Sequence, residues 1–412
     1  MRWKYAAGGL DADYPSFVHT VLCDMRARLR KSERPNRIFE VVLEVARQAG
    51  FVGRKRVLDS TALYDAVATQ DTITMLRSAI RGLLRTANAA LANEIRAVLR
   101  REDDYASPGK PACDWDDLPA REALIDALVR DAHAALLLFD GKDVDADVNQ
   151  ALTLLATVVG QDIEAGDHGV FRIVRGVAPD RVISTVDPEA RHGHKTSARG
   201  FDGYKGHISA DPDSEIITAT TVTPGNAADG SVANELLVEV FAGEAPSAAT
   251  ADEGSSEAAN EGRAIEIFGD SSYGTASVVE HIEGKGALAH AKVQAPSSRK
   301  GMYSKDEFEV DLDTGTVRCP RGVLVVIQPH SDGGGRADFA DHCEDCPLRE
   351  RCTSAKAGRQ VKIHPHERTI ANKRAQQRDP AWKKHYRATR PKVERKLAHI
   401  MRRRHGGRRA RV

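Results

Sequence analysis

Three acidic residues, Asp59, Asp270 and Glu394, stand in sequence settings that could bring carboxylates together around divalent cations. Asp270 follows the apolar residues 265–269, which predict a short buried strand with the carboxylate at its C-terminal tip. Asp59 follows a weaker apolar run and is predicted to end a second strand. Ligands gather outside the carboxyl ends of strands in open α/β sheets, so carboxylates at these positions are well placed to bind metal ions.

Three such carboxylates could share two magnesium ions, which prefer oxygen ligands and neutralise charge on the attacking and leaving oxygens of a phosphodiester. The chain holds 59 acidic residues, so spacing alone does not select this triple over a set of solvated or capping carboxylates. For the first acid the rival is Asp187. Because Asp187 precedes a proline, we expect it to begin a turn, and we prefer Asp59.

The elements that must position these residues change character along the chain. Apolar residues at helical spacing predict mainly helices from about residue 14 to 166, with one long helical pattern over residues 73–99. Residues 181–186, 203–210 and 215–223 are rich in β-formers. The turn-forming residues 211–214 predict a hairpin between the last two.

Two further helices are predicted at residues 234–241 and 276–284, on either side of the Asp270 strand. The final segment is helical apart from Pro391, which is expected to begin the last helix. Arg390 lies four positions before Glu394, so on a helix both share a face, and the arginine could grip a phosphate beside the carboxylate. This order of elements fits a mixed sheet with helices on its faces better than a repeating βαβ fold.

Four of the six cysteines, Cys319, Cys343, Cys346 and Cys352, form a group that could close a tetrahedral zinc site. Clustered thiols in a reducing compartment do not normally form disulfides. The spacing before Cys352 is irregular, and His342 could replace one ligand. We favour a structural Zn²⁺ ion over four reduced thiols.

The C-terminal end is strongly basic, with ten lysines and arginines against one acid in residues 390–412. Such a field suits a polyanion, although basic ends also attract phosphates non-specifically. Beside Glu394, a role in holding DNA is the better interpretation. Lys205 and His207 lie on one predicted strand and could face DNA, but a solvated sheet face is favoured two to one. The candidate DNA-binding residues are Arg390, Lys396, Arg402, Arg403, Arg404 and Lys205.

Length and composition describe a chain of two or three domains, or one domain with insertions. It has 412 residues, of which 29% are charged and 41% hydrophobic, and its net charge is +1. No run approaches the 18 apolar residues of a membrane span, so no membrane partner is expected. The first residues lack an apolar signal region, which favours the cytoplasm.

An ordered set of motifs over nearly the whole chain resembles the DDE transposases of bacterial insertion sequences. The motifs are RVLDST at 56–61, DPEAR at 187–191, FDGYKGH at 201–207, VTPGNAAD at 222–229, GDSSYG at 269–274 and RPKVERK at 390–396. The resemblance implies an α/β fold: a ribonuclease-H-like mixed sheet, a large helical insertion after the first strand and a small cysteine-cluster insertion before the last helix.

The same resemblance implies that Asp59, Asp270 and Glu394 bind two Mg²⁺ or Mn²⁺ ions while water or a DNA 3′-hydroxyl attacks a phosphodiester. Family members often show a tyrosine, arginine, glutamate and lysine series near the glutamate. Here Tyr386 lies one residue farther from Arg390 than is usual, and Met401 stands where the lysine is expected. Transposases of this kind often carry a cysteine cluster between the second aspartate and the glutamate.

The expected domain organisation follows from these assignments. It comprises a partial N-terminal helical DNA-binding region (1–52), the first core strand (53–60), the helical insertion (61–178), the catalytic core (179–300), the cysteine-cluster insertion with zinc (301–375), and the final catalytic helix with its basic tail (376–412). Similar proteins commonly extend farther at both ends, so truncation of the chain at both ends is an open alternative.

The predicted function is metal-dependent cleavage and strand transfer at insertion-sequence ends. The partners are double-stranded DNA, as terminal inverted repeats and target, and a second copy of the chain. The expected location is the bacterial cytoplasm, at the nucleoid. The alternative is an inactive transposase remnant that only binds DNA. A nuclease unrelated to transposition would not be expected to carry the ordered motifs.

Overall fold

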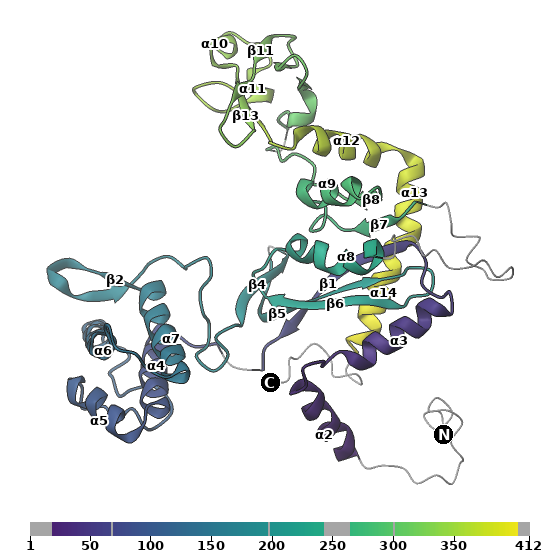
Figure 1. Cartoon of the computed structure of the whole chain (residues 1–412). Coiled ribbons are helices and arrows are strands. Elements are labelled where there is room, and N and C mark those ends of the chain that lie inside the picture. The colour runs from purple at the N-terminus through teal and green to yellow at the C-terminus, as the bar shows by residue number, and fades with distance from the viewer. Residues whose placement is uncertain (1–18, 67–68, 197, 243–263, 300, 403–412) are drawn as a thin grey trace, which may run out of the picture.

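A mixed six-stranded sheet lies between two sets of helices at the centre of the computed structural model (Figure 1). The structure describes residues 19–66, 69–196, 198–242, 264–299 and 301–402. The strands of the sheet are β1 (Lys55–Tyr64), β4 (Arg191–Thr196), β5 (Arg199–Ala210), β6 (Ile217–Pro224), β7 (Glu266–Gly269) and β8 (Leu288–Ala291). β5 is antiparallel to β1, β4 and β6, whereas β1, β7 and β8 are mutually parallel.

The predicted hairpin between β5 and β6 is confirmed. Its turn is held by Asp211, whose Oδ1 accepts hydrogen bonds from the backbone N–H groups of Asp213 (2.7 Å) and Ser214 (2.9 Å). Aspartate favours such turns because its short side chain can bond the backbone two residues on. The sequence thus predicted both the hairpin and its register-setting turn.

The strand predicted at residues 181–186 is wrong, because that segment has no strand partner. Its backbone instead bonds to side chains and a loop: the N–H of Val182 donates to Gln161 Oε1 at 2.8 Å, and the carbonyl of Ile183 accepts from the N–H of Gln70 at 2.9 Å. The β-forming residues here therefore connect Gln161 to Gln70 instead of pairing in the sheet. Asp187 lies in the turn that follows, as expected.

Strand β1 is longer than predicted, and Asp59 lies within it rather than at its end. β1 pairs with β7 only as far as Val57, but with β5 from Val57 to Tyr64. Asp59 therefore lies just beyond the part of β1 that pairs with β7, but within the part that pairs with β5. An antiparallel neighbour as long as β5 carries β1 past the position at which its apolar run stops.

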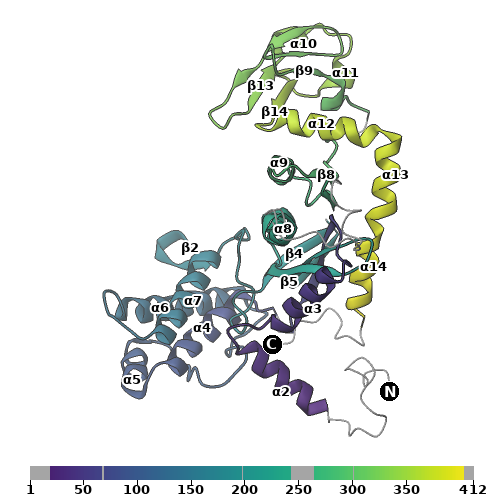
Figure 2. The same cartoon turned by 45° about the vertical axis from the view of Figure 1, so that its right-hand side comes forward.

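Alternation along the strands divides the sheet into two buried faces. Leu58 and Ile267 pack with α8 (Ala233–Ala242) and α9 (Ala276–Gly284). Their neighbours Val57 and Phe268 pack on the other face with Tyr386 of α13 (Pro380–Thr389) and with residues of α14 (Pro391–Ile400). Figure 2 shows the two helix sets on opposite sides of the sheet. The predicted bounds of α9 and the predicted start of α14 at Pro391 are confirmed.

A helical lobe follows β1 and has a hydrophobic core of its own. It contains α4 (Thr72–Thr86), α5 (Ala89–Val98), α6 (Leu118–Leu138), α7 (Ala146–Asp162), the short strands β2 (Ile163–Ala165) and β3 (Phe171–Ile173), and the 3₁₀ turn η1 (Asp167–Gly169). The continuous helix predicted over 73–99 is wrong. Ala87 and Asn88 are extended, and Asn88 caps α5 by accepting a hydrogen bond from Leu91 N at 3.0 Å.

Arg77 connects α4 to the loop after α5 through a buried ion pair with Asp103. Its Nε and Nη2 contact the two carboxylate oxygens of Asp103, each at 2.8 Å, and the two side chains are 5% and 8% exposed. Replacing Arg77 with methionine is expected to lower the free energy of unfolding by about 3 kcal/mol at pH 7, because a buried carboxylate loses its partner. Denaturant unfolding measures the change.

The loss of unfolding free energy in the Arg77→Met protein should be smaller at acidic pH. The hydrogen bond from Arg77 is the main cause that holds the pKa of Asp103 below its ordinary value of 3.8. A depressed carboxyl pKa contributes stability above the ordinary value and loses it as the pH falls through the lowered one. The control is Arg85→Met on the exposed face of the same helix, which should change stability by less than about 0.5 kcal/mol. Equal losses at both positions would contradict the prediction.

A small module precedes the final helices and contains the grouped cysteines (Figure 1). Its strands are β9 (Glu309–Asp311), β10 (Thr316–Arg318), β11 (Leu324–Val326), β12 (Gln328–Pro329), β13 (Gly335–Asp338) and β14 (Gln360–Ile363). Its helical turns are η4 (Lys305–Glu307), α10 (Ala340–Cys343) and α11 (Arg349–Cys352), and α12 (Glu367–Arg378) leads from it to α13.

The remaining described elements are the N-terminal helices α2 (His19–Arg30) and α3 (Arg37–Gln48), and the turn η2 (Asp229–Val232) before α8. Helix α3 is joined to α8 by Arg47, whose Nη2 lies 2.9 Å from Glu239 Oε2. No helix in the described part of the chain combines the length and apolarity needed to cross a bilayer.

Candidate active site

Arg390 stands at the junction of α13 and α14 and contacts three carboxylates that are far apart in sequence. Its Nη2 lies 2.9 Å from Asp59 Oδ1 and 3.8 Å from Asp270 Oδ2, and its Nη1 lies 3.5 Å from Glu394 Oε1. The structure therefore brings together all three acids predicted from the sequence. Asp187 is not among them, because its carboxylate accepts a hydrogen bond from Tyr204 Oη at 2.6 Å.

Register and alternation explain why the two aspartates face the same way. The last paired positions of β1 and β7 are Val57 and Phe268, which both point toward α13 and α14. Asp59 and Asp270 each follow two residues later, and side chains repeat on one face of a strand every two residues. They therefore lie side by side on the face that receives Arg390.

Apolar packing and one hydrogen bond fix the helices that carry Arg390 and Glu394. Val393 and Leu397 of α14 are buried against the sheet. Tyr386 of α13 stacks on Trp382, with ring centroids 4.9 Å apart, and its hydroxyl donates to the carbonyl of Gly269 at 3.0 Å. Burial raises the pKa of Tyr386 to about 12, so the hydroxyl stays a donor. Tyr386 thus anchors α13 to the residue that precedes Asp270.

The three carboxylates differ in exposure, so the site extends from the protein interior to the solvent. The side chains of Asp59, Asp270 and Glu394 are 9%, 37% and 63% exposed. Burial raises the pKa of Asp59, while the charge of Arg390 and the N–H of Ser60 oppose that rise. Three carboxylates form a hard oxygen donor set that suits Mg²⁺ or Mn²⁺. Arg390 is the cation that balances them in this structure.

A second polar network lies behind Asp59 on the α8 face, around Asp229. Asp229 accepts hydrogen bonds from Ser60 Oγ at 2.6 Å and from Lys205 Nζ at 2.8 Å. His207 is 1% exposed and bonds Tyr273 and Thr223, each at 2.9 Å. His207 therefore lies neither on a solvated face nor toward a partner, so both interpretations offered from the sequence are wrong for this residue.

Lys205 is only partly exposed and its ammonium pairs with Asp229, so its contact with DNA stays a prediction. Period-2 alternation could not show that α8 and η2 cover this face. Sequence reasoning gave Asp229 no role, although the residue closes the VTPGNAAD motif at 222–229. That motif was the available signal for its importance.

The other candidate DNA contacts lie on or after α14. Lys396 Nζ is 3.4 Å from Glu215 Oε2 in the β5–β6 turn, and Arg402 is exposed. The same turn pairs with two further α14 residues, Lys392 and Arg395. Arg403 and Arg404 lie outside the described residues.

The four grouped cysteines surround one small cavity of about 20 Å³, which has room for a single water-sized species. Cys343 and Cys352 are buried, Cys319 and Cys346 are partly buried, and His342 also lines the cavity. Burial is the main cause that raises the pKa of Cys352, and the neighbouring thiols raise it further. These thiols and His342 are the groups that could hold a metal ion here, although no three of the sulfurs lie within 4.8 Å of one another.

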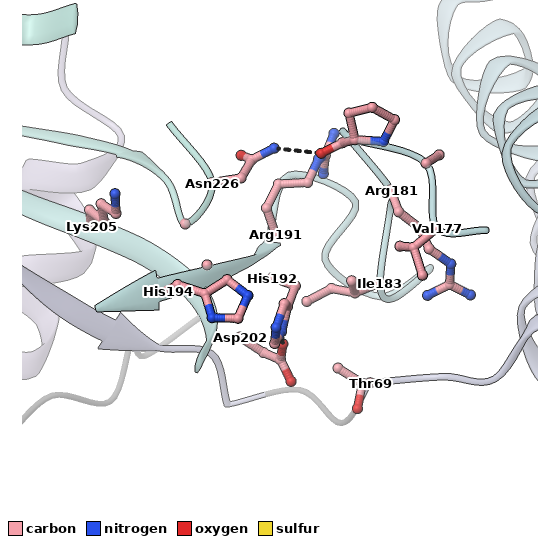
Figure 3. A pocket seen from close by; sticks show the side chains of 14 residues that line it. Thr69, Val177, Arg181, Ile183, Arg191, His192, His194, Asp202, Lys205 and Asn226 are labelled. Carbon is pink, nitrogen blue, oxygen red and sulfur yellow. Dashed lines mark hydrogen bonds and ion pairs between the residues drawn. The ribbon is translucent and has the colours of Figure 1, made fainter. Parts of the chain in front are cut away.

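A cavity of about 790 Å³ opens where the helical lobe meets β4 and β5, but it does not include the three carboxylates (Figure 3). Four of its basic side chains already have acidic partners: Arg181 pairs with Asp162, Arg191 with Asp180, His192 with Asp202 and Lys205 with Asp229. Figure 3 shows His192 directed at Asp202. The convergence around Arg390 is therefore the stronger candidate for chemistry.

Residues 318–412 match the family model described as the transposase DDE domain. The matched part is somewhat under a quarter of the chain and includes Arg390 and Glu394, whereas Asp59 and Asp270 lie before it. No significant match was found among curated proteins or among solved structures. The match supports a DDE-type transposase.

Proposed function

We propose that this DDE-type transposase cuts DNA at the ends of an insertion sequence and transfers the cut strands, with Asp59, Asp270 and Glu394 as its catalytic carboxylates. The observation that carries the proposal is the convergence of these three acids on Arg390, each within 4 Å of its guanidinium nitrogens. Divalent metal ions are general in this family, and Mg²⁺ or Mn²⁺ suits the oxygen donors.

The strand order supports a ribonuclease-H-like core as part of the same proposal. The order is β4-β5-β1-β7-β8, and β6 also pairs with β5; the pairs that involve β5 are antiparallel, whereas β1, β7 and β8 are parallel. We propose that the lobe of residues 72–173 is an insertion after the first core strand. The cysteine module is then a second insertion, between β8 and the final helices.

Each residue has a defined task in the proposed reaction. Two divalent ions, when bound, neutralise charge on the attacking and leaving oxygens of the phosphodiester. Asp59, Asp270 and Glu394 would hold those ions, with Asp59 fixed by β1 and the backbone N–H of Ser60. Arg390 is then free to turn its Nη groups toward the phosphate, since guanidinium binds phosphate oxygens in a fork.

The basic surface beside the triad supports DNA as substrate. Lys396 and Arg402 could contact phosphates, and the surface ion pair of Lys396 with Glu215 is weak enough to exchange for a phosphate. We propose double-stranded DNA with terminal inverted repeats, a target duplex, and a homodimer that joins two ends. The proposed location is the bacterial cytoplasm, at the nucleoid. A protein that only binds DNA is not favoured, because all three acids are present and converge.

Cleavage of a labelled duplex that carries the element's inverted repeats tests the proposal. With Mg²⁺ the protein should nick the strand at the repeat, and chelation of the metal should stop cleavage without releasing the DNA. Binding without cleavage in Mg²⁺ or Mn²⁺ would instead identify a protein that only binds DNA.

Zinc at the cysteine module is a separate proposal with its own prediction. Cys346→Ser is expected to lower the zinc content by one equivalent per chain, because a tetrahedral site needs all four ligands. Metal analysis measures the loss, and Cys113→Ser outside the group is the control. A Cys346→Ser protein with a full complement of zinc would remove this site.

A further inference from the structure

Two histidines and a glutamate form a group near the edge of the sheet, apart from the catalytic carboxylates and the cysteines. Glu266 begins β7, His290 lies in the edge strand β8, and His385 lies in α13. One ligand atom of each lies within 4.8 Å of the other two, and no other such group is found among the described side chains. The three residues come from three separate elements of the chain.

The geometry concentrates both imidazoles on one carboxylate oxygen. His385 Nε2 lies 2.6 Å and His290 Nε2 lies 3.0 Å from Glu266 Oε2. The other oxygen, Oε1, is turned toward Lys55 Nζ at 4.0 Å. Ligand atoms about 2.05 Å from a tetrahedral zinc ion stand roughly 3.3 Å apart. Each nitrogen therefore needs to move less than about 1 Å away from Oε2 to reach that spacing, and the three ligand atoms already lie within 4.8 Å of one another.

His290 is left without a hydrogen bond in this arrangement. Both of its ring nitrogens are buried, and its approach to Glu266 does not have hydrogen-bond geometry. A buried imidazole whose one close polar contact, with Glu266, lacks hydrogen-bond geometry is unusual, because an unsatisfied polar group costs free energy.

Aromatic packing fixes the orientation of both rings. Phe268 stacks on His290 with ring centroids 4.6 Å apart and meets the His385 ring edge-on at 5.2 Å. The side chain of His385 is 40% exposed, so the group has one side open to solvent. Such a site has three protein ligands and an open position for water.

We propose that Glu266, His290 and His385 bind a first-row divalent transition metal ion, with Co²⁺ and Zn²⁺ as the probe ions. Imidazole donors favour such ions over Mg²⁺ or Ca²⁺, so the site differs in kind from the three carboxylates around Arg390. Glu266 is at the opposite end of β7 from Asp270. The ion would join α13 to β7 and β8, and so would fix the helix that leads to Arg390.

Cobalt(II) titration of metal-free, full-length protein tests this site separately from the cysteines. Imidazole and carboxylate ligands give ligand-field bands without the thiolate-to-cobalt charge-transfer band that a cysteine site adds. We expect the wild-type protein to bind one equivalent of Co²⁺ without thiolate character. His385→Ala and Glu266→Gln should each lose that equivalent, and Zn²⁺ should raise the Tm of the wild type more than that of either variant.

The matched control is His366→Ala. His366 pairs with Glu280 at 2.8 Å but belongs to no three-ligand group among the described residues, so its loss should leave the equivalent in place. Circular dichroism checks that the variants fold, and Glu266→Gln keeps the side-chain volume. If His385→Ala and Glu266→Gln bind as much cobalt as the wild type, the proposal is wrong. Neither readout needs DNA cleavage, so the result is independent of the proposed transposase activity.

Discussion

Asp270→Asn is expected to abolish metal-dependent DNA cleavage, by roughly 10³-fold or more, while the protein still folds and binds DNA. The side chain of Asp270 is 37% exposed, and its Oδ1 accepts a hydrogen bond from the N–H of Ser272 at 2.9 Å. Asparagine can keep that bond and the volume, but it removes the negative charge that a metal ion requires. The measurement is single-turnover cleavage of the inverted-repeat duplex, with DNA binding followed in parallel.

Asp306→Asn is the matched control for this change. The Asp306 side chain is 32% exposed and pairs with Arg374 and Arg378, away from the three carboxylates. Its loss should leave cleavage within a few-fold of the parent, since surface ion pairs contribute little. Cleavage by the Asp270→Asn protein at the parental rate would show that the catalytic assignment is mistaken.

Arg390→Met is expected to lower the free energy of unfolding by about 3–5 kcal/mol in metal-free buffer. The arginine side chain is 6% exposed and is the charge partner of the nearly buried Asp59, which methionine leaves without one. Cleavage should also be lost, because the proposed phosphate contact disappears. Thermal unfolding and the cleavage assay measure the two effects.

The change in Tm on adding Mg²⁺ distinguishes a role of Arg390 in the carboxylate site from a general role in packing. Without Arg390, the three carboxylates repel one another, so Mg²⁺ should bind more tightly and raise the Tm of Arg390→Met more than that of the parent. Arg56→Met is the control, because Arg56 is 3% exposed and pairs with Glu239 on the other face of the sheet. It should lose comparable stability without the added response to Mg²⁺. Equal responses in both variants would argue against a cation site at Arg390.

Several features of this fold could be predicted because the determining groups are neighbours in sequence. Asp211 makes its own turn, Pro391 begins a helix, and the apolar residues before Asp270 form a strand. The break in the helix predicted over 73–99 also has a local cause, the Asn88 cap, which the apolar spacing concealed. The ordered motifs indicated a DDE transposase, which the match of residues 318–412 supports.

The position of Asp59 within β1 could not be predicted, because it depends on the length of the antiparallel neighbour β5. The burial of His207 and the pairing of Lys205 depend on Asp229 and on the elements that cover that face. A single strand cannot specify which of its faces another element will cover. The group formed by Glu266, His290 and His385 likewise required the packing of α13 on the sheet.

The sequence by itself determined the chemistry available to this protein: three candidate carboxylates, an arginine one helical turn from the last of them, and a cluster of thiols. The tertiary structure alone decided that Arg390 would contact all three carboxylates, which strand register and helix packing bring within 4 Å of its nitrogens. The physical reason is the sequence range over which each kind of interaction acts. Caps, turns and periodicity act over a few residues, whereas a shared ion site depends on contacts between segments hundreds of residues apart.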